Sequence, residues 1–130
     1  MRFRFAIVAL AIITAPAFAQ PSCPAPQAPM LDIELLLGRR GSEARWRQFL
    51  AREVTPRFPD GLTVYETRGQ WRDPERKLIV RERSRVLRIL APADAPVLDK
   101  IDAVASAYKK QFVQKSVGIV TRPACASFTD

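Results

Sequence analysis

Three arginines, Arg81, Arg83 and Arg85, alternate with Glu82 and Ser84 in the middle of the chain. Successive side chains of a β-strand point to opposite faces, so in a strand the three guanidinium groups share one face. A guanidinium group binds a carboxylate or a phosphate through two parallel hydrogen bonds. The spacing therefore predicts either an anion-binding site or a solvated strand whose arginines pair with acids on a neighbouring strand.

The anion-binding hypothesis includes basic and aromatic side chains nearby. Tyr65, Thr67 and Trp71 share a face by alternation and can form an aromatic platform, although Trp71 can equally pack over a turn. The predicted ligand-binding residues are Arg57, Tyr65, Trp71, Arg72, Arg81 and Arg83. In the solvated alternative, the arginines form cross-strand pairs, for example with Glu66.

Acid–base catalysis has weaker support. The chain has no histidine, which excludes the Ser-His-Asp triad, haem ligation by imidazole and zinc sites that contain histidine. If Glu66 and Glu82 face each other across a hairpin, they supply the carboxylate pair that glycoside cleavage requires. The arginines on either side of Glu82 favour its charged form over a proton donor. We expect binding rather than catalysis, with no cofactor or metal, and Glu82, Glu66 and Tyr65 as the catalytic candidates to test.

The start of the chain has the features of a cleaved export signal. Arg2 and Arg4 precede an apolar stretch, residues 5–15, that is too short to span a bilayer, and an A-x-A cleavage motif ends at Ala19. We predict cleavage after Ala19 and a periplasmic or secreted protein, with an uncleaved membrane anchor as the alternative. The predicted divisions are a signal peptide (1–19), a Pro-rich tail (20–30) and one domain (31–130).

The two cysteines, Cys23 and Cys125, stand near opposite ends of the chain, which does not fit a CxxC redox or metal motif. Oxidising compartments form and keep disulfides, so export favours a bond between them. Closing a loop of about 100 residues stabilises a domain by roughly 4 to 5 kcal/mol in the chain-entropy model. The alternative is that Cys23 belongs to a loose tail.

The net charge of +8 falls to +6 when the predicted signal is removed. Such a charge attracts anionic lipid headgroups, acidic polysaccharides or anionic small molecules, and it also keeps a protein soluble. Nucleic acid is not an expected partner, because the protein is predicted to be exported and has no aromatic-basic RNA-binding signature. The expected partner is an anionic small molecule or an envelope component.

Hydrophobic patterning predicts the elements in the first half of the domain. Residues 31–37 form an apolar run typical of a buried central strand. Ser42 is a favourable N-cap for a helix that ends before Pro56. The apolar residues at helical spacing are Trp46, Phe49, Leu50 and Val54.

The second half begins with a predicted hairpin. A turn at residues 59–61 leads into a strand over 62–71, a reversal begins at Asp73-Pro74, and a second strand covers 78–90. Asp94 then caps a helix, and a last strand covers 116–122. The core face of this helix is predicted to consist of Val97, Ile101, Val104, Tyr108 and Phe112.

The resulting order, βαββαβ, predicts an α+β ferredoxin-like fold of the split-βαβ type. Its four-stranded antiparallel sheet has the first and third strands in the centre and both helices on one face. The other face is solvated, binds a ligand, or is closed by a second subunit in a homodimer. Alternation exposes Leu36, Val86 and Leu90 on that face, where Glu34 and Arg88 can pair across the central strands.

One conflict remains in the arginine-bearing strand. Leu87 and Ile89 continue the face of the three arginines, although large apolar residues are expected to face the core. Three unpaired guanidinium groups cannot lie beneath helices. Either the hairpin projects beyond the helical layer, or a bulge near Ser84 changes the facing of the strand.

A family resemblance runs from about residue 35 to residue 128. It is carried by TPRFPDGLTV, GQWRDP, RERSRVL, AYKKQF, QKSV and the Cys-x-x-Phe motif that begins at Cys125. These segments resemble an exported bacterial domain-of-unknown-function family, number 3574, and the resemblance implies no activity or catalytic residue. Two loops depart from the family pattern: residues 75–77 replace an expected turn glycine, and residues 38–42 are shortened.

Overall fold

A computed structural model describes residues 22–38 and 40–129, so the predicted export signal lies outside the described residues. The elements are β1 (Ala28–Gly38), α1 (Glu43–Phe49), the π-helical turn η1 (Leu50–Val54), β2 (Thr63–Arg72), β3 (Ile79–Pro92), α2 (Ala95–Phe112) and β4 (Gly118–Ala126). Because η1 continues α1 directly, the order is βαββαβ, as predicted.

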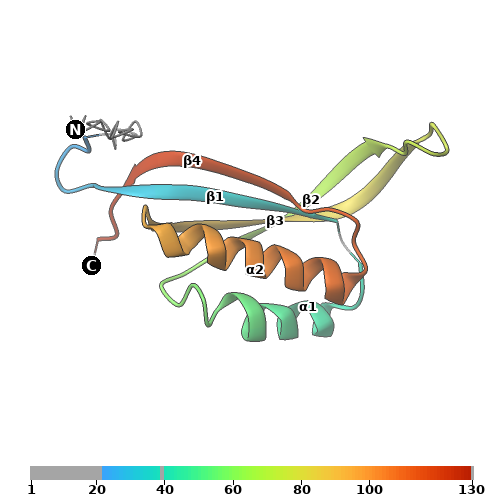
Figure 1. Cartoon of the computed structure of the whole chain (residues 1–130), viewed down its shortest axis with the longest axis horizontal. Coiled ribbons are helices and arrows are strands. Elements are labelled where there is room, and N and C mark those ends of the chain that lie inside the picture. The colour runs from blue at the N-terminus through green and yellow to red at the C-terminus, as the bar shows by residue number, and fades with distance from the viewer. Residues whose placement is uncertain (1–21, 39, 130) are drawn as a thin grey trace, which may run out of the picture.

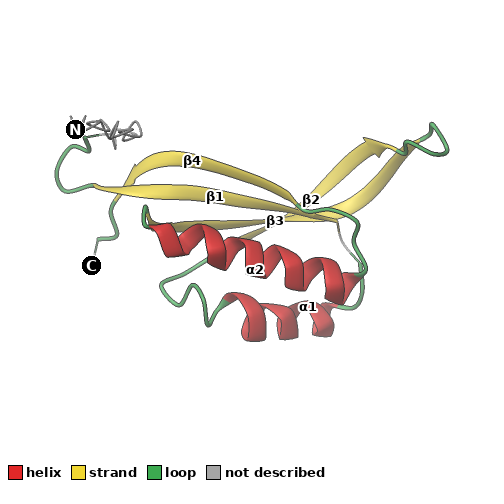
Figure 2. Ribbon diagram, in the orientation of Figure 1, coloured by secondary structure: helices red, strands yellow, loops and turns green. Residues whose placement is uncertain are grey.

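The four strands form one antiparallel sheet in the order β2-β3-β1-β4. The first and third strands are therefore central, which confirms the predicted ferredoxin-like topology. Both helices lie on the same side of the sheet (Figures 1 and 2). Among the described residues, no helix covers the opposite face of the sheet (Figure 1).

The helix ends follow the local sequence. Ser42 is the N-cap of α1, and its hydroxyl accepts a hydrogen bond from the Arg45 backbone N–H at 3.2 Å. Asp94 occupies the N-cap position of α2, but its side chain makes no capping bond in the described part of the chain. Val113 ends α2 in the left-handed conformation, with φ 52° and its N–H bonded to the Lys109 carbonyl.

The core lies between the sheet and the two helices. All five predicted core residues of α2 are buried, and so are Trp46, Phe49 and Val54 from the first helical segment, while Leu50 is partly buried against them. Phe49 lies edge-on to Tyr108 and Phe112, with ring centroids 5.3 and 5.6 Å apart. The spacing of apolar residues therefore predicted the buried helical faces correctly.

The strands β1 and β4 are longer than predicted. β1 begins at Ala28 rather than at residue 31, because Ala28 pairs with Ala126 of β4. β4 likewise runs through Pro123, which an edge strand tolerates because one of its sides needs no backbone donor. The end of the predicted Pro-rich tail therefore belongs to the sheet.

The predicted disulfide joins Cys23 to Cys125, with Cα atoms 5.5 Å apart. It ties the segment before β1 to β4, next to the cross-strand pair of Pro29 and Cys125. Within residues 22–38 and 40–129, no helix has the length and apolar character needed to cross a membrane.

Candidate functional site

The hairpin of β2 and β3 extends past the rest of the sheet. β1 accompanies β3 only from Pro92 to Ser84, whereas β2 accompanies it as far as Ile79. Residues 68–72 and 79–83 therefore form a two-stranded ribbon, and Figure 1 shows this ribbon projecting beyond both helices. The pairing of β2 with β3 continues without a break along the hairpin, so the projecting hairpin is correct and the bulge near Ser84 is not.

The ribbon has one strongly basic face. Side chains alternate along β3, so Arg83 and Arg81 lie on the same side of the strand as the core-facing Leu87. In the β2–β3 register Arg68 lies opposite Arg83, and Arg72 lies opposite Ile79, so these residues share the same side. We call Arg68, Arg72, Arg81 and Arg83 the arginine face.

Electrostatics on the arginine face are unfavourable without a ligand. Like charges directly opposite each other destabilise a strand pair, and Arg68 lies opposite Arg83. All four arginines are exposed, and within residues 22–38 and 40–129 none of them forms an ion pair. An open depression of about 380 Å³ is lined by Arg68, Gly69, Gln70, Arg81, Glu82 and Arg83. The ribbon therefore presents guanidinium groups whose hydrogen-bonding edges are available to an anion.

Arg68 was missed by the sequence analysis. It lies four residues before Arg72, so alternation along β2 places the two on the same face. That periodicity is visible in the sequence, but the pairing of Arg68 with Arg83 depends on the hairpin register. No repeat along a single strand contains that information.

Asp73 organises the turn at the end of the ribbon. Its carboxylate accepts hydrogen bonds from the backbone N–H groups of Glu75 and Arg76 at 2.9 and 3.1 Å, and from the Arg76 side chain at 3.0 Å. The backbone donors hold the pKa of Asp73 below its ordinary value. Lys77 takes the left-handed conformation, with φ 59°, in the turn where a family glycine was expected. A local network thus shapes a turn that lacks that glycine.

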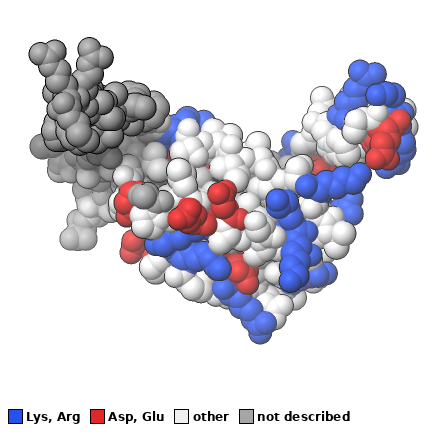
Figure 3. Space-filling view, viewed as in Figure 1, with Lys and Arg blue, Asp and Glu red and all other residues white. Residues whose placement is uncertain are grey.

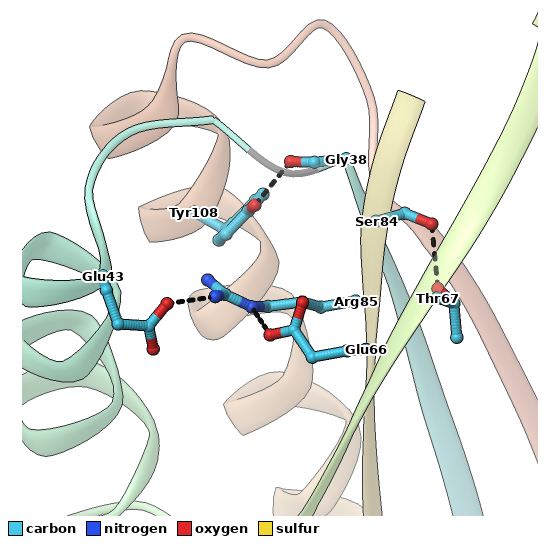
Figure 4. Close-up of polar contacts among 7 residues, drawn as sticks. All are labelled: Gly38, Glu43, Glu66, Thr67, Ser84, Arg85 and Tyr108. Carbon is cyan, nitrogen blue, oxygen red and sulfur yellow. Dashed lines mark hydrogen bonds and ion pairs between the residues drawn. The ribbon is translucent and has the colours of Figure 1, made fainter. Parts of the chain in front are cut away.

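Arg85 lies at the root of the ribbon and differs from the arginine face (Figure 4). It is only 3% exposed and donates hydrogen bonds to the carboxylates of Glu43 in α1 and Glu66 in β2. Its guanidinium group lies 4.5 Å from the ring centroid of Trp46. Arg85 therefore links the first helix to the hairpin instead of facing a ligand, and its pair with Glu66 is the cross-strand contact that the solvated alternative predicted.

Two further polar contacts surround this root. The Tyr108 hydroxyl donates a hydrogen bond to the Gly38 carbonyl at 2.7 Å, and burial raises the pKa of Tyr108 to about 12. The hydroxyls of Thr67 and Ser84 are 2.8 Å apart on the last cross-strand pair before the ribbon (Figure 4). At the base of the ribbon, one hydrogen bond therefore joins β2 to β3, and another joins α2 to the end of β1.

The predicted six-residue binding cluster is only partly assembled. Arg72, Arg81 and Arg83 share the arginine face, whereas Tyr65 and Trp71 point to the opposite side of the hairpin. Arg57 lies before β2, away from the ribbon end of that strand, and pairs with Glu53 at 3.2 Å. The aromatic platform and the arginines therefore do not converge on one ligand.

The predicted carboxylate pair does not form. Glu66 lies opposite Arg85, and Glu82 lies opposite Gly69, so the two carboxylates point to different faces of the hairpin. The β3 partner of Glu66 is three residues away from Glu82, and this odd offset places the two side chains on opposite faces. Within residues 22–38 and 40–129, the acidic and cysteine side chains form no cluster that could hold a metal ion.

The open face of the sheet has its own charged cluster. Arg88 donates two hydrogen bonds to Asp32, at 2.7 and 3.1 Å, and Arg122 contacts both Asp32 and Glu34. Glu34 and Arg88 lie opposite each other in the β1–β3 register, as expected. Within the described residues their side chains form no ion pair, because the long Arg88 side chain reaches diagonally to Asp32 while Arg122 contacts Glu34. The hydrogen bond from Arg88 holds the pKa of Asp32 below its ordinary value of 3.8, although burial acts in the opposite direction.

The sequence match identifies the family. Residues 34–128 match the family described as "Protein of unknown function (DUF3574)". The chain belongs to this family. None of the curated proteins matches the chain.

Several solved structures share the fold of this family member. A phage SAM lyase in complex with S-methyl-5'-thioadenosine has 12% identity and a TM-score of 0.58, covering 86% of this chain and 99% of the lyase chain. The periplasmic divalent cation tolerance protein CutA from Archaeoglobus fulgidus has 9% identity and a TM-score of 0.52, covering 73% of this chain and 83% of the CutA chain. CutA from Synechococcus elongatus has 13% identity and a TM-score of 0.53, covering 77% of this chain and 80% of that CutA chain. At these identities the likeness concerns the fold alone.

Proposed function

We propose that this protein is an exported, non-catalytic module that binds an anionic ligand or envelope component on the arginine face. The observation that carries the proposal is the placement of Arg68 opposite Arg83 on a projecting ribbon, with neither residue in an ion pair within the described part of the chain. Such a pair opposes folding, and a bound anion relieves the repulsion.

The spacing of the arginine face suits a ligand with several acidic oxygens. Opposite residues on one face of a strand pair have Cβ atoms about 5 Å apart, and residues two apart along a strand are about 7 Å apart. A phosphate or carboxylate between Arg68 and Arg83 is therefore within reach of both guanidinium groups. Arg81 is the next basic group along β3 and can bind a second acidic group of the same ligand.

Export is supported by the disulfide between Cys23 and Cys125, because oxidising compartments preserve such bonds. The predicted signal and its cleavage after Ala19 remain proposals. Mass measurement of the protein recovered from the bacterial periplasm tests them. Recovery of the uncleaved chain in the membrane fraction would support the anchor alternative instead.

Thermal shift measurements with phosphates, carboxylates and anionic glycan fragments test the binding proposal. We expect stabilisation by a subset of these anions, and loss of that stabilisation in Arg81→Gln and Arg83→Gln. Arg52→Gln is the matched control, because Arg52 is exposed on η1 and carries the same charge away from the ribbon. An equal loss of stabilisation in the control would show that the anion effect depends only on net charge, which would contradict a site on the ribbon.

The open sheet face supports a second proposal, self-association. Leu36 and Tyr65 are each nearly half exposed there, while the predicted Val86 and Leu90 are partly buried. An apolar surface of this kind gains free energy when a second copy covers it. Sedimentation of the wild type and Leu36→Ser tests this alternative, and a monomer at high protein concentration would remove it.

A further inference from the structure

Exposed apolar side chains gather at the end of the ribbon. Trp71 is 46% exposed, Leu78 62% and Ile79 50%. Trp71 and Ile79 belong to the last two cross-strand pairs, and Leu78 lies in the adjoining turn. Two strands without a covering layer cannot bury these side chains. Trp71 and Ile79 lie on opposite faces of the ribbon, so the apolar side chains surround its tip. This grouping at a projecting end is unlike the singly scattered apolar residues of an ordinary surface.

The same segment is strongly cationic. Residues 68–83 contain six Lys and Arg side chains and three Asp and Glu side chains, an excess of three positive charges. Two of the three acids are already engaged, because Asp73 bonds within the turn and Glu75 pairs with Lys115 at 3.6 Å. Figure 3 shows basic side chains on the projecting end of the molecule, with a smaller acidic patch beside them.

This combination matches the interface of an anionic bilayer. Trp and large aliphatic side chains favour the headgroup region, and basic side chains are attracted to anionic lipid. The binding of a protein surface to a bilayer strengthens with both its buried apolar area and its attraction to anionic lipids. A soluble phosphate or glycan would use the arginines but would leave the apolar tip in water. The tip is therefore the observation that favours a lipid surface over a soluble anion.

We infer that the ribbon docks the protein on an anionic lipid surface, with Trp71, Leu78 and Ile79 entering the headgroup region and the arginine face contacting lipid phosphates. This inference rests on the proposed function and names its ligand class. The ribbon's five residues per strand extend about 17 Å beyond the four-stranded sheet. That length allows the tip to enter the interface ahead of the four-stranded sheet.

Tryptophan fluorescence provides a direct test. The protein has two Trp residues; Trp46 is buried, and Trp71 is exposed. We expect vesicles of phosphatidylglycerol mixed with phosphatidylcholine to shift the emission to the blue and to protect Trp71 from aqueous acrylamide. Phosphatidylcholine vesicles produce neither effect. Trp71→Phe abolishes the spectral change while keeping the signal of Trp46.

Variants separate apolar insertion from charge. Leu78→Ser combined with Ile79→Ser weakens binding to the phosphatidylglycerol vesicles by at least about tenfold, and leaves any thermal shift with free phosphate unchanged. Leu98→Ser is the matched control, because Leu98 is 49% exposed on α2. This control keeps the vesicle affinity of the wild type. Arg83→Gln weakens binding to both vesicles and free anions.

The outcomes distinguish the inference from the proposed function. If vesicle binding requires Arg83 but is unaffected by Leu78→Ser with Ile79→Ser, and Trp71 stays open to acrylamide, docking through the tip is overturned and anion binding survives. Equal binding to phosphatidylcholine also overturns it. If neither vesicles nor free anions bind, the proposed function itself fails.

Discussion

β2 and β3 pass through two regions with opposite demands, the four-stranded body and the two-stranded ribbon. In the body, the helix-facing side of β3 carries Leu87 and Ile89, which are buried. In the ribbon, the same side of the same strand carries Arg81 and Arg83, which are exposed. The layer that covers a strand, and not the strand itself, therefore decides which side chains its face requires.

Arg83 and Arg85 show this difference over two residues. Arg85 lies beneath the edge of the helical layer and shares two carboxylates, because a buried charge must be paired. Arg83 lies beyond that edge, opposite Arg68. The first is a structural residue of the body, whereas the second belongs to the proposed binding surface. Substitutions in each region test this division.

The largest expected effect comes from the disulfide of the body. Cys23→Ser with Cys125→Ser opens a loop that spans 102 positions and lowers the free energy of unfolding by roughly 4 to 5 kcal/mol in the chain-entropy model. Urea denaturation measures the loss. Anion binding by the folded fraction at low temperature should be retained, because the ribbon lies at the other end of the sheet. A loss below about 1 kcal/mol would show that the bond adds little to the body.

Arg85→Met should produce the next largest effect. It removes the guanidinium group shared by Glu43 and Glu66 and its contact with Trp46. Both carboxylates are about half exposed, so we expect a loss of about 2 kcal/mol, less than for a fully buried pair. Arg83→Met is the matched control on the same face of β3 and should change the urea midpoint little. Equal losses of stability in the two variants would contradict the proposed boundary between body and ribbon.

Acid should affect the two regions differently through Asp32 and Asp73. The pKa of each is lowered by folding, so its contribution to stability is complete above about pH 4 and is lost as the pH falls through the lowered value. Asp32 lies in the body, and we expect Asp32→Asn to make the acid-induced loss of stability shallower. Asp73 lies in the turn of the ribbon, outside the four-stranded body, so we expect Asp73→Asn to change the acid transition reported by buried Trp46 fluorescence less than Asp32→Asn does. A larger change in the acid transition for Asp73→Asn than for Asp32→Asn would contradict this division between body and ribbon.

The smallest expected effect on stability belongs to Arg83→Gln. Removing one of two like charges on opposite strands should raise the free energy of unfolding by about 0.3 kcal/mol. The same substitution should abolish the thermal shift caused by anions. A gain of stability with a loss of binding is typical of a site maintained for function. A loss of more than about 1 kcal/mol would instead assign Arg83 a structural role in the body.

Some expectations depended only on local patterns, and these were correct. Helical spacing identified the buried faces of α1 and α2, including Trp46 and Tyr108. Alternation placed Arg81 and Arg83 on one face, and the expected bond between Cys23 and Cys125 is present. The predicted convergence of Tyr65 with the arginines and the facing of Glu66 with Glu82 failed, because both required a relation between two strands.

The sequence by itself therefore determined the elements, their order, the apolar faces and the residues that share a side of one strand, because these follow from the periods of the helix and the strand. Only the tertiary structure decided that Arg68 lies opposite Arg83, that Glu82 faces away from Glu66, and where the helical layer ends. Hairpin register depends on the turn, and a shift of one residue moves every side chain to the other face. Arg85 is buried and Arg83 exposed for a separate reason, because the helices cover one position of β3 and stop before the other.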